Sequence, residues 1–377
     1  MNRKFHHHAS RLATTSGGCA IAAVAILAGC SNQGQTASAP ARREVVAQAM
    51  LPLSRGAVDA LFAHSETMGE TRALIVMRDG RMVYEAYGEG FGPGSRLISW
   101  SMAKSITSVL VGMLVADGRL ILDDPAPIAD WQRPGDPRGA ITLRHLLTMS
   151  SGLDHREEGD PTWDSNTVEM LFGTGVGDMA AMAQAQPPVA AAGEMFNYSS
   201  ATSVILSGII ASALTDSNVP AVRRDAVRNF VEGRLSAPLG MTSLVPEFDA
   251  SGTMIGGSIM HATARDYAKF GEFLRRRGVT ADGARLVPDS WIAFMLTPSS
   301  ANRGYGGHIW LNRDRGNANS PLWPDAGPAD LFACLGHQGQ FILVSPSERV
   351  TVVRLGISTD PQIAHVRRGL QRLMAHR

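Results

Sequence analysis

Residues 101–114 read SMAKSITSVLVGML, and this stretch decides both the fold and the chemistry that the sequence predicts. Asp117 and Gly118 follow it, a pair that is typical of a helix end. The apolar residues within it recur at the spacing of an α-helix, at Ile106, Val109, Leu110, Met113 and Leu114. We therefore expect a buried helix that begins near Ser101.

Ser101 and Lys104 stand three residues apart at the start of this helix, so their side chains share one face of it. Burial lowers the pKa of an amine, which lets a neutral lysine take a proton from a serine hydroxyl. The amide groups at a helix start also favour negative charge on the serine oxygen. Apart from Lys4 and Lys269, arginine supplies every other basic side chain, so Lys104 calls for an explanation. Taken alone, however, this spacing of serine and lysine is weak evidence.

The two ends of the chain each predict a β-hairpin. Near the start, the apolar and β-branched residues 73–77 and 81–87 flank Asp79-Gly80, a pair typical of a type I′ turn. Near the end, residues 341–344 and 350–355 predict a second hairpin, and an amphipathic helix follows it.

The middle of the chain predicts mostly helices, including segments at residues 143–147 and 204–214. Strands at both ends with helices between them indicate an α+β fold. We expect one antiparallel sheet made from both chain ends, flanked by helices, with a mostly helical region inserted. Residues 154–188 are rich in Gly, Asp and Met and show little periodicity, so we expect a loop over the site there.

The first 29 residues have the features of a signal peptide: basic residues, no acidic residue, and an apolar run too short to span a bilayer. The run ends in Leu27-Ala28-Gly29-Cys30, which resembles a bacterial lipobox. That resemblance implies cleavage before Cys30 and lipidation of this cysteine, and Ser31 after it implies a periplasmic, lipid-anchored protein at the outer membrane. An ordinary secretory signal with a chance cysteine is the alternative. Residues 30–48 would form a flexible tether, and residues 49–377 the folded domain.

Composition excludes several classes of protein. The chain has 377 residues, 44% of them hydrophobic, so it can bury a large core. Its formal net charge of +1 offers no basic face for a phosphate backbone, so we expect no nucleic-acid partner. With Cys19 and Cys30 in the N-terminal segment, Cys334 is left without a partner, and the fold depends on no disulfide.

Two further segments carry residues that suit a serine hydrolase. Residues 193–200 read GEMFNYSS and run into a helix, which places Tyr198 at a turn from which its phenol can project. Residues 336–340 read GHQGQ and precede a strand, so their glycines allow close backbone approach and an amide donor at the strand edge. Either segment alone is more often a surface turn than a site.

Taken together and in this order, these residues resemble the serine β-lactamase and penicillin-binding protein superfamily. The resemblance is to its class C-like branch, which includes esterases, D-aminopeptidases and 6-aminohexanoate-dimer hydrolases. Its three motifs are S-x-x-K, Y-x-N or Y-S-x, and K-T-G or H-x-G, matched here by residues 101–104, 198–200 and 337–339. The segments LLTMSSGL at 146–153 and PLGM at 238–241 also look like that branch.

The resemblance implies a role for each matching residue. Ser101 would be the nucleophile, Lys104 its general base, and Tyr198 the relay of a proton to the leaving group. The backbone amides of Ser101 and Gln340 would form the oxyanion hole, beside His337 and Gly339. Two departures make efficient penicillin hydrolysis doubtful: Ser200 replaces the Asn of β-lactamases, and His337 replaces the Lys that meets the β-lactam carboxylate. No G-x-S-x-G elbow occurs, so an α/β-hydrolase is not supported.

Other candidate residues favour structural interpretations. We expect Cys334 to be a small buried residue and Lys269 a solvated helix position. His145 and His261 have no second ligand at metal spacing, so we expect no metal and no cofactor. Three tryptophans are candidates to line the cleft, at Trp163, Trp310 and Trp323.

The sequence thus predicts a serine hydrolase that cleaves a small ester, amide or peptide through an acyl-enzyme on Ser101, such as a carboxylesterase or a 6-aminohexanoate-oligomer-type amidase. A peptidoglycan DD-peptidase or a weak β-lactamase is the alternative within enzymes. A non-catalytic envelope lipoprotein that binds peptides in the same cleft is the alternative outside them.

Overall fold

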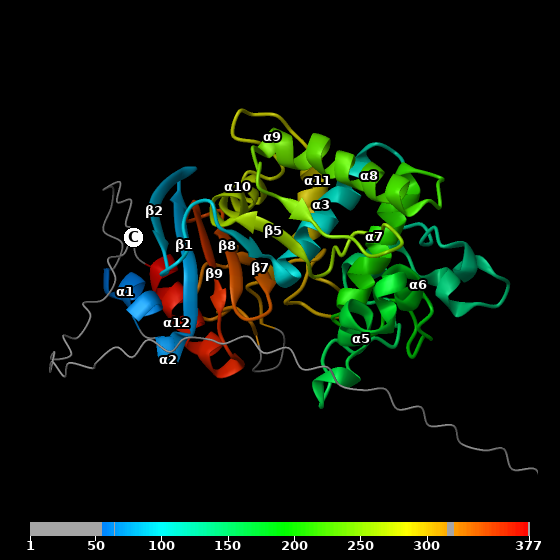
Figure 1. Cartoon of the computed structure of the whole chain (residues 1–377), viewed down its shortest axis with the longest axis horizontal. Helices are drawn as coiled ribbons and strands as arrows, with labels where there is room; N and C mark the ends of the chain where they lie inside the picture. Colours follow the sequence, from blue (N-terminus) through cyan, green and yellow to red (C-terminus); the bar gives the residue numbers. More distant parts are fainter. Residues whose placement is uncertain (1–54, 64, 315–319, 376–377) are drawn as a thin grey trace, which may run out of the picture. The chain divides into compact units, whose positions relative to one another are not determined.

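The structure is a computed structural model that describes residues 55–63, 65–314 and 320–375 (Figure 1). The predicted signal peptide at 1–29, the tether at 30–48 and Cys30 lie outside these residues. None of the described helices is both long and apolar enough to cross a membrane.

The helices are α1 (Arg55–Ala63), α2 (Ser65–Met68), α3 (Ala103–Ala116), α4 (Leu143–Leu147), α5 (Asn166–Phe172), α6 (Met179–Gln184), α7 (Ser200–Leu214), α8 (Pro220–Val231), α9 (Ala237–Leu239), α10 (Ala264–Arg275), α11 (Asp289–Met295) and α12 (Asp360–Ala375). The strands are β1 (Glu70–Arg78), β2 (Arg81–Tyr87), β3 (Arg96–Ile98), β4 (Val245–Pro246), β5 (Met260–Thr263), β6 (Trp310–Leu311), β7 (Phe332–Gly336), β8 (Gln340–Ser345) and β9 (Val350–Ile357).

The main sheet joins the two ends of the domain, as the sequence predicts. Its strand order is β2-β1-β9-β8-β7-β6, and every neighbouring pair is antiparallel. Ala73 of β1 lies opposite Leu355 of β9, so the first and last hairpins share one ladder. Asp79 and Gly80 have φ angles of 54° and 79°, which are the two positive values that a type I′ turn requires. The expected α+β fold is confirmed.

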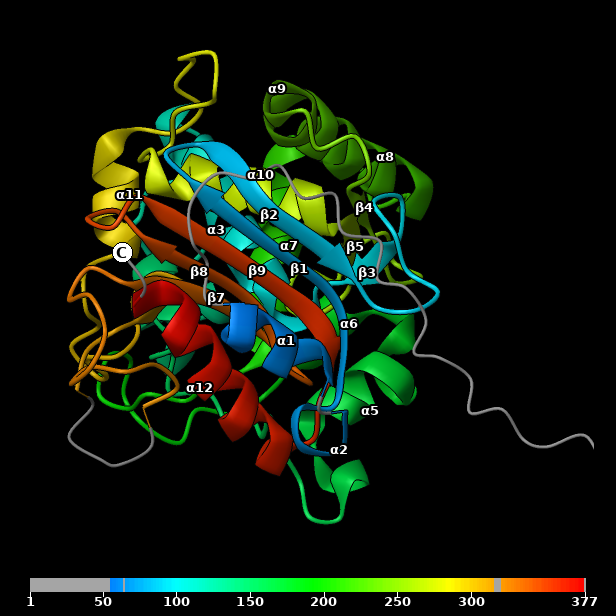
Figure 2. The ribbon, with the colours of Figure 1, turned by 90° about the vertical axis from the view of Figure 1, so that its left-hand side faces the viewer.

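Helices cover both faces of this sheet (Figure 2). On one face α10 packs against β1, β8 and β9, and on the other α1 and α12 pack against each other and against β1 and β9. The amphipathic helix expected after the second hairpin is α12, whose buried Val366, Leu370 and Leu373 face the sheet. A second sheet, of order β3-β5-β4, lies apart from the first.

The buried helix expected from the opening stretch is α3, which is buried from Ala103 to Leu114 and packs against α7. Because α3 is buried from Ala103 to Leu114 and α7 from Ser200 to Ala211, both belong to the interior of the inserted helical region. The helical segment expected at 143–147 is α4. Gly118 ends the α3 segment with a φ of 71°, as the Asp-Gly pair predicts.

The expectation of a loop over residues 154–188 is partly wrong, because α5 and α6 lie within it. Both helices are short and depend on their N-caps. The Ser165 side chain accepts from the amides of Thr167 and Val168, and the Asp178 side chain accepts from the amide of Ala181. Such short helices give too few turns for the periodic pattern that sequence reasoning relies on.

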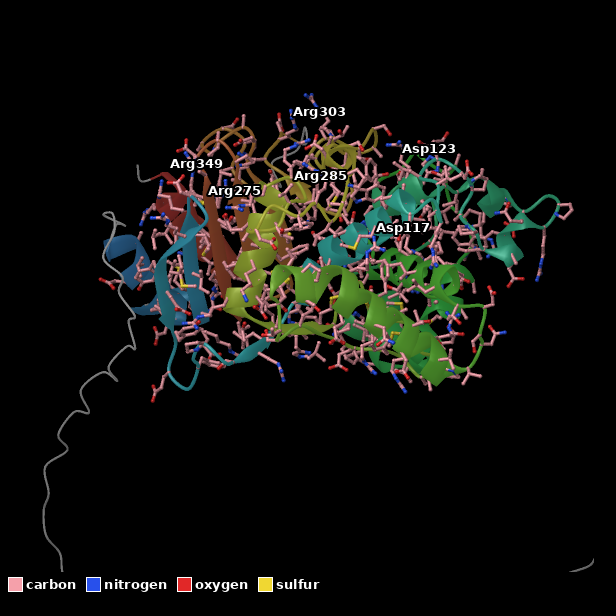
Figure 3. All side chains as sticks on the ribbon, turned by 90° about the horizontal axis from the view of Figure 1, so that it is seen from above. Asp117, Asp123, Arg275, Arg285, Arg303 and Arg349 are labelled. Carbon is pink, nitrogen blue, oxygen red and sulfur yellow. The ribbon has the colours of Figure 1, made fainter. Side chains whose placement is uncertain are left out.

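Several surface charges form ion pairs. Asp117 pairs with Arg234 at 2.7 Å, and Asp123 pairs with Arg144 at 2.6 Å. Figure 3 shows Asp123 and Arg349 near the edge of the molecule in that view. Exposed pairs of this kind contribute little to stability, so the charged groups that require an explanation are the buried ones.

Candidate functional site

Ser101 and Lys104 meet at the start of α3. Ser101 lies in the one-turn helix η1 (Trp100–Met102), and Lys104 lies in the first turn of α3. Lys104 Nζ is 3.0 Å from Ser101 Oγ. Lys104 is only 1% exposed, whereas Ser101 remains partly open to solvent. A buried amine therefore lies against an accessible hydroxyl.

The Lys104 amine has three hydrogen-bond partners. Besides Ser101 Oγ, these are Ser200 Oγ at 2.7 Å and the Gly257 carbonyl at 2.8 Å. Burial lowers the pKa of Lys104 to about 8, against the opposing effect of the Glu157 carboxylate. A pKa near neutrality gives a usable fraction of the neutral amine, which is the form that can accept a proton.

The backbone next to Ser101 is held in an unusual conformation. Trp100 has a φ of 44°, a left-handed value that is uncommon for a residue with a large side chain. Ser99 fixes the approach to this turn, because its amide donates to the Met260 carbonyl at 2.8 Å and its Oγ accepts from the Met260 amide at 3.1 Å. The strain is thus supported by β5, immediately before Ser101.

Tyr198 lies beside the same pair of residues. It comes directly before Ser199, whose side chain caps α7 by accepting from the Thr202 amide. Lys104 Nζ lies 4.8 Å from the centre of the Tyr198 ring, and the Tyr198 hydroxyl shares a hydrogen bond with the Ser101 side chain. Desolvation raises the pKa of Tyr198 well above its usual range, so the phenol keeps its proton. The structure therefore brings Ser101, Lys104 and Tyr198 together.

The GHQGQ segment forms the turn between β7 and β8. Gln338 and Gly339 have φ angles of 59° and 81°, and His337 is exposed. The His337 ring packs edge-on against Trp100, with ring centroids 5.3 Å apart. The turn thus lies against the residue that precedes the nucleophile.

Gln340 has a structural partner that the sequence does not reveal. Its side chain donates to the Gly356 carbonyl at 2.6 Å and accepts from the Gly356 amide at 3.0 Å. The same side chain donates to the His337 carbonyl at 3.0 Å, so these bonds tie the start of β8 both to β9 and to the β7–β8 turn. Only the backbone of Gln340 is left for a role at the site.

A buried arginine, Arg354, supports the turn between β7 and β8. Arg354 of β9 donates to the Gly339 carbonyl at 2.8 Å, to the Glu70 carbonyl at 3.1 Å and to Ser358 Oγ at 2.9 Å. Burial lowers the pKa of Arg354 to about 9. Sequence reasoning missed Arg354, because a single arginine in an apolar strand carries no sign of its partners.

Sequence reasoning also missed Glu157. Its Oε1 accepts from Ser200 Oγ at 2.6 Å, and its Oε2 accepts from the Ser200 amide at 2.5 Å and from Thr167 Oγ1 at 2.7 Å. Lys104 Nζ lies 3.9 Å from Oε1. Glu157 falls in the aperiodic segment before α5, where no motif singles it out. The two neighbouring acidic side chains Asp154 and Glu158 are exposed, whereas Glu157 is only partly so.

A buried histidine, His308, lies between α7 and α4. His308 Nδ1 is 2.7 Å from the Leu147 carbonyl, and its Nε2 is 2.8 Å from Ser203 Oγ. Burial lowers the pKa of His308 to about 3, so the ring is neutral. With both nitrogens engaged, His308 links α7 to the end of α4.

The remaining candidates lie where structural roles are expected. Cys334 is buried in β7, and burial raises the pKa of its thiol to about 12. Lys269 bonds Asp266 at 2.7 Å on α10, and its side chain is partly exposed. His145 helps to cap α4, and His261 faces Glu247.

One of the three candidate tryptophans lies at the site. Trp310 packs against Tyr198 and Tyr305, with ring centroids 5.4 and 4.9 Å apart. Trp163 is exposed, and Trp323 is partly buried against the core on the other face of the main sheet. Within residues 55–63, 65–314 and 320–375, no three His, Cys, Asp or Glu side chains lie close enough together to hold a metal ion.

Residues 65–375 match the model of the family described as Beta-lactamase. A 6-aminohexanoate-dimer hydrolase of Paenarthrobacter ureafaciens is 25% identical over 305 residues, which cover 78% of this chain and 74% of that protein.

Solved structures share the fold. A putative 6-aminohexanoate-dimer hydrolase from Bacillus anthracis superposes with a TM-score of 0.62 at 18% identity, covering 82% of this chain and 80% of that one. A family VIII carboxylesterase gives 0.61 at 16% identity, covering 88% and 100%. A D-stereospecific amidohydrolase from Streptomyces gives 0.57 at 20% identity, covering 82% and 97%.

Proposed function

Because the chain belongs to the β-lactamase family of serine hydrolases, we propose that it cleaves a small ester or amide through an acyl-enzyme on Ser101. One observation carries this proposal: the buried Lys104 amine lies 3.0 Å from the accessible Ser101 hydroxyl. A serine with an adjacent base of suitable pKa is the arrangement that nucleophilic catalysis needs.

Acylation begins when neutral Lys104 accepts the Ser101 proton as Ser101 Oγ attacks the substrate carbonyl. A tetrahedral intermediate forms, and its oxyanion needs amide donors. These are the Ser101 amide and an amide of the β7–β8 hairpin, for which the family resemblance names Gln340. Tyr198 then gives its proton to the leaving alcohol or amine, which departs as the carbonyl re-forms, and the Lys104 ammonium returns the proton it accepted to Tyr198. Water releases the acyl group by the same steps in reverse order, with Ser101 as the leaving group.

The substrate proposal rests on the two departures from the β-lactamase motifs. At position 200 a serine hydroxyl replaces the side-chain amide of Asn. At position 337 a histidine replaces the lysine that meets a β-lactam carboxylate. Tyr198, which lies beside Ser101, packs against Tyr305 and Trp310, so an aromatic cluster adjoins the nucleophile on this side. Among the relatives are proteins named as a 6-aminohexanoate-dimer hydrolase, a carboxylesterase and an amidohydrolase. A carboxylesterase or 6-aminohexanoate-oligomer-type amidase fits these features better than a penicillinase.

The decisive experiment is intact-mass spectrometry after incubation with a fluorophosphonate, an activated ester and a β-lactam. We expect the fluorophosphonate and the ester to add one acyl or phosphonyl mass to the wild type and none to Ser101→Ala. Stable labelling by the β-lactam with slow turnover would favour the DD-peptidase alternative. No labelling by any probe would leave a peptide-binding lipoprotein.

The same proposal includes the location. The Leu27-Ala28-Gly29-Cys30 site supports a periplasmic enzyme anchored to the outer membrane through lipid on Cys30. Cys30→Ala should move the protein from the membrane fraction to the soluble fraction. Continued sedimentation of this variant with membranes would contradict the anchor.

A further inference from the structure

Glu157 belongs to none of the three motifs, yet it lies behind the catalytic pair that the proposed function requires. Both of its oxygens are occupied: Oε1 by the Ser200 hydroxyl, and Oε2 by the Ser200 amide and the Thr167 hydroxyl. Its distance of 3.9 Å from Lys104 Nζ is too long for direct proton transfer. Any effect of Glu157 on the reaction must therefore pass through Ser200 or through its charge.

The direction of each hydrogen bond follows from the chemistry of the groups. An ionised carboxylate only accepts, so the Ser200 hydroxyl must donate its single proton to Glu157. Ser200 Oγ then has only lone pairs to offer Lys104, 2.7 Å away, and the Gly257 carbonyl, 2.8 Å away, can likewise only accept.

A neutral lysine amine has two N–H bonds and one lone pair. Ser200 and Gly257 take the two N–H bonds, so the lone pair is left for the third neighbour, Ser101. Ser101 can then donate its proton to Lys104, as a general-base step needs. If the Ser200 hydroxyl instead pointed at Lys104, it would occupy the lone pair and compete with Ser101.

We infer that Glu157 is a positioning residue: through the Ser200 hydroxyl, it directs the lone pair of neutral Lys104 toward Ser101. This inference rests on the proposed function, since it assigns Glu157 a part in the acylation of Ser101. Glu157 itself transfers no proton.

The local structure holds Glu157 in this place. Thr167 lies in the first turn of α5, and Ser165, the N-cap of α5, donates to the Glu157 carbonyl at 2.7 Å. Both the side chain and the backbone of Glu157 are therefore fixed by the start of α5. On the other side, the Ser200 amide fixes Oε2 at the first turn of α7.

The charge of Glu157 acts in the opposite direction to its positioning role. A nearby carboxylate favours the protonated lysine, and Glu157 does raise the pKa of Lys104 against the effect of burial. The other titratable groups that interact with Lys104 or Glu157 are Tyr198, Tyr305, His155 and His308. Burial raises the pKa values of the two tyrosines and lowers those of the two histidines, so all four are neutral near pH 7. If Glu157 acted by charge alone, its neutralisation would increase the fraction of neutral Lys104 and speed acylation at pH 7.

Glu157→Gln separates the two effects. The Ser200 amide needs an acceptor, so it holds the glutamine oxygen at the place of Oε2 and leaves the NH2 group facing Ser200 Oγ. That NH2 group donates to Ser200, whose hydroxyl proton then points to Lys104. The substitution therefore reverses the bond that directs the lone pair while keeping the size of the side chain.

The test is the rate constant of the acylation burst with a p-nitrophenyl ester, measured from about pH 6 to about pH 10. We expect Glu157→Gln to lower the high-pH plateau about 10- to 100-fold and to move the acid limb to lower pH, because Lys104 loses a neighbouring negative charge. Glu158→Gln, the same change at the exposed adjacent residue, should alter neither. A faster rate at pH 7 with an unchanged plateau would overturn the inference.

A double-mutant cycle with Ser200→Ala tests the route. Ser200→Ala keeps the hydrogen bond from the backbone amide of residue 200 to Glu157 and removes only the hydroxyl, so it should lower the high-pH plateau by itself. This variant alone therefore tests the inference if Glu157→Gln fails to fold. Adding Glu157→Gln to Ser200→Ala should change the high-pH plateau less than about twofold, because only the positioning effect acts on the plateau. An undiminished effect in that background would show that Glu157 merely supports the backbone and would contradict the inference.

If wild-type Ser101 acylates but Glu157→Gln acylates equally fast, only this inference fails. If wild-type Ser101 never acylates, the proposed function fails with it.

Discussion

The Trp100 ring packs edge-on against the His337 ring, with centroids 5.3 Å apart, and so joins the turn before Ser101 to the turn between β7 and β8. Both turns contain residues with positive φ, at Trp100 and at Gln338 and Gly339. Gly336 lies close to the same place, since a Cβ on it would be 2.4 Å from the Ser99 carbonyl oxygen. The nucleophile and the expected substrate-contacting turn are thus built as one unit.

His337→Lys should raise reactivity toward β-lactams more than toward neutral esters. The exposed position at the turn lets a lysine ammonium reach a ligand carboxylate, which a charge-assisted hydrogen bond would stabilise. We expect the ratio of β-lactam to ester acylation rates to rise about tenfold, as one such bond of about 1.5 kcal/mol allows. The measurement is the acylation rate for one substrate of each kind.

His337→Gln is the matched control, because it places an uncharged hydrogen-bonding side chain on the same turn. It should leave the ratio near the wild-type value. An equal ratio for the lysine and glutamine variants would mean that His337 does not face the substrate.

Acylation should become faster as pH rises through about 8. Burial lowers the pKa of Lys104 to about 8, and only the neutral amine accepts the Ser101 proton. From about pH 7 to about pH 9 the neutral fraction of a group with this pKa rises about tenfold. Burial raises the pKa values of Tyr198 and Cys334 far above this range, so neither should contribute to the limb.

The pH profile is measured as the burst rate constant with a p-nitrophenyl ester. Alkaline hydrolysis of the ester is subtracted with Ser101→Ala under the same conditions. A flat profile over this range would be incompatible with Lys104 as the base.

The sequence predicts the parts of the fold whose cause is local. The apolar spacing of 101–114, the Asp79-Gly80 turn and the last hairpin each depend on residues near one another in the chain, and all three are present. The pairing of Ser101 with Lys104 belongs to this class, since both lie on one helical turn. The sequence alone could not predict the roles of Glu157 and Arg354, because their partners lie outside the local segment. Glu157 bonds Ser200, and Arg354 bonds Gly339 and Glu70. Whether such a charge is buried is decided by packing between segments, which no short pattern records.

Arg354→Met should destabilise the domain by about 3 kcal/mol, because it leaves buried carbonyl groups without a donor. The groups affected are the carbonyls of Gly339 and Glu70, together with Ser358 Oγ. Urea unfolding measures this as a lower midpoint at an unchanged slope. Arg368→Met, on the exposed side of α12, is the control and should shift the midpoint little. Equal midpoints for the two variants would remove Arg354 from the support of the β7–β8 turn.

Lys104→Arg separates the charge of this residue from its ability to accept a proton. A guanidinium keeps the cation but, with a pKa above about 12, cannot act as a base near neutral pH. If Lys104 accepts the Ser101 proton, acylation should fall about 10²- to 10⁴-fold, the usual effect of losing a general base. If Lys104 only supplies charge, the variant should keep much of its rate.

The larger guanidinium introduces a second effect, because it must fit among Ser101, Ser200 and Gly257 in a buried space. Lys104→Met is the control: it is close to lysine in length, uncharged and suited to burial. Both variants should lose acylation. Thermal unfolding checks that each still folds, and Lys104→Met should have the lower melting temperature of the two, because it leaves the Gly257 carbonyl without a donor. If Lys104→Arg kept a rate within about tenfold of the wild type, the loss would be smaller than the loss of a general base causes. In that case Tyr198 or His337 would be the candidate base, and the inferred positioning role of Glu157, which requires Lys104 to be the base, would fail.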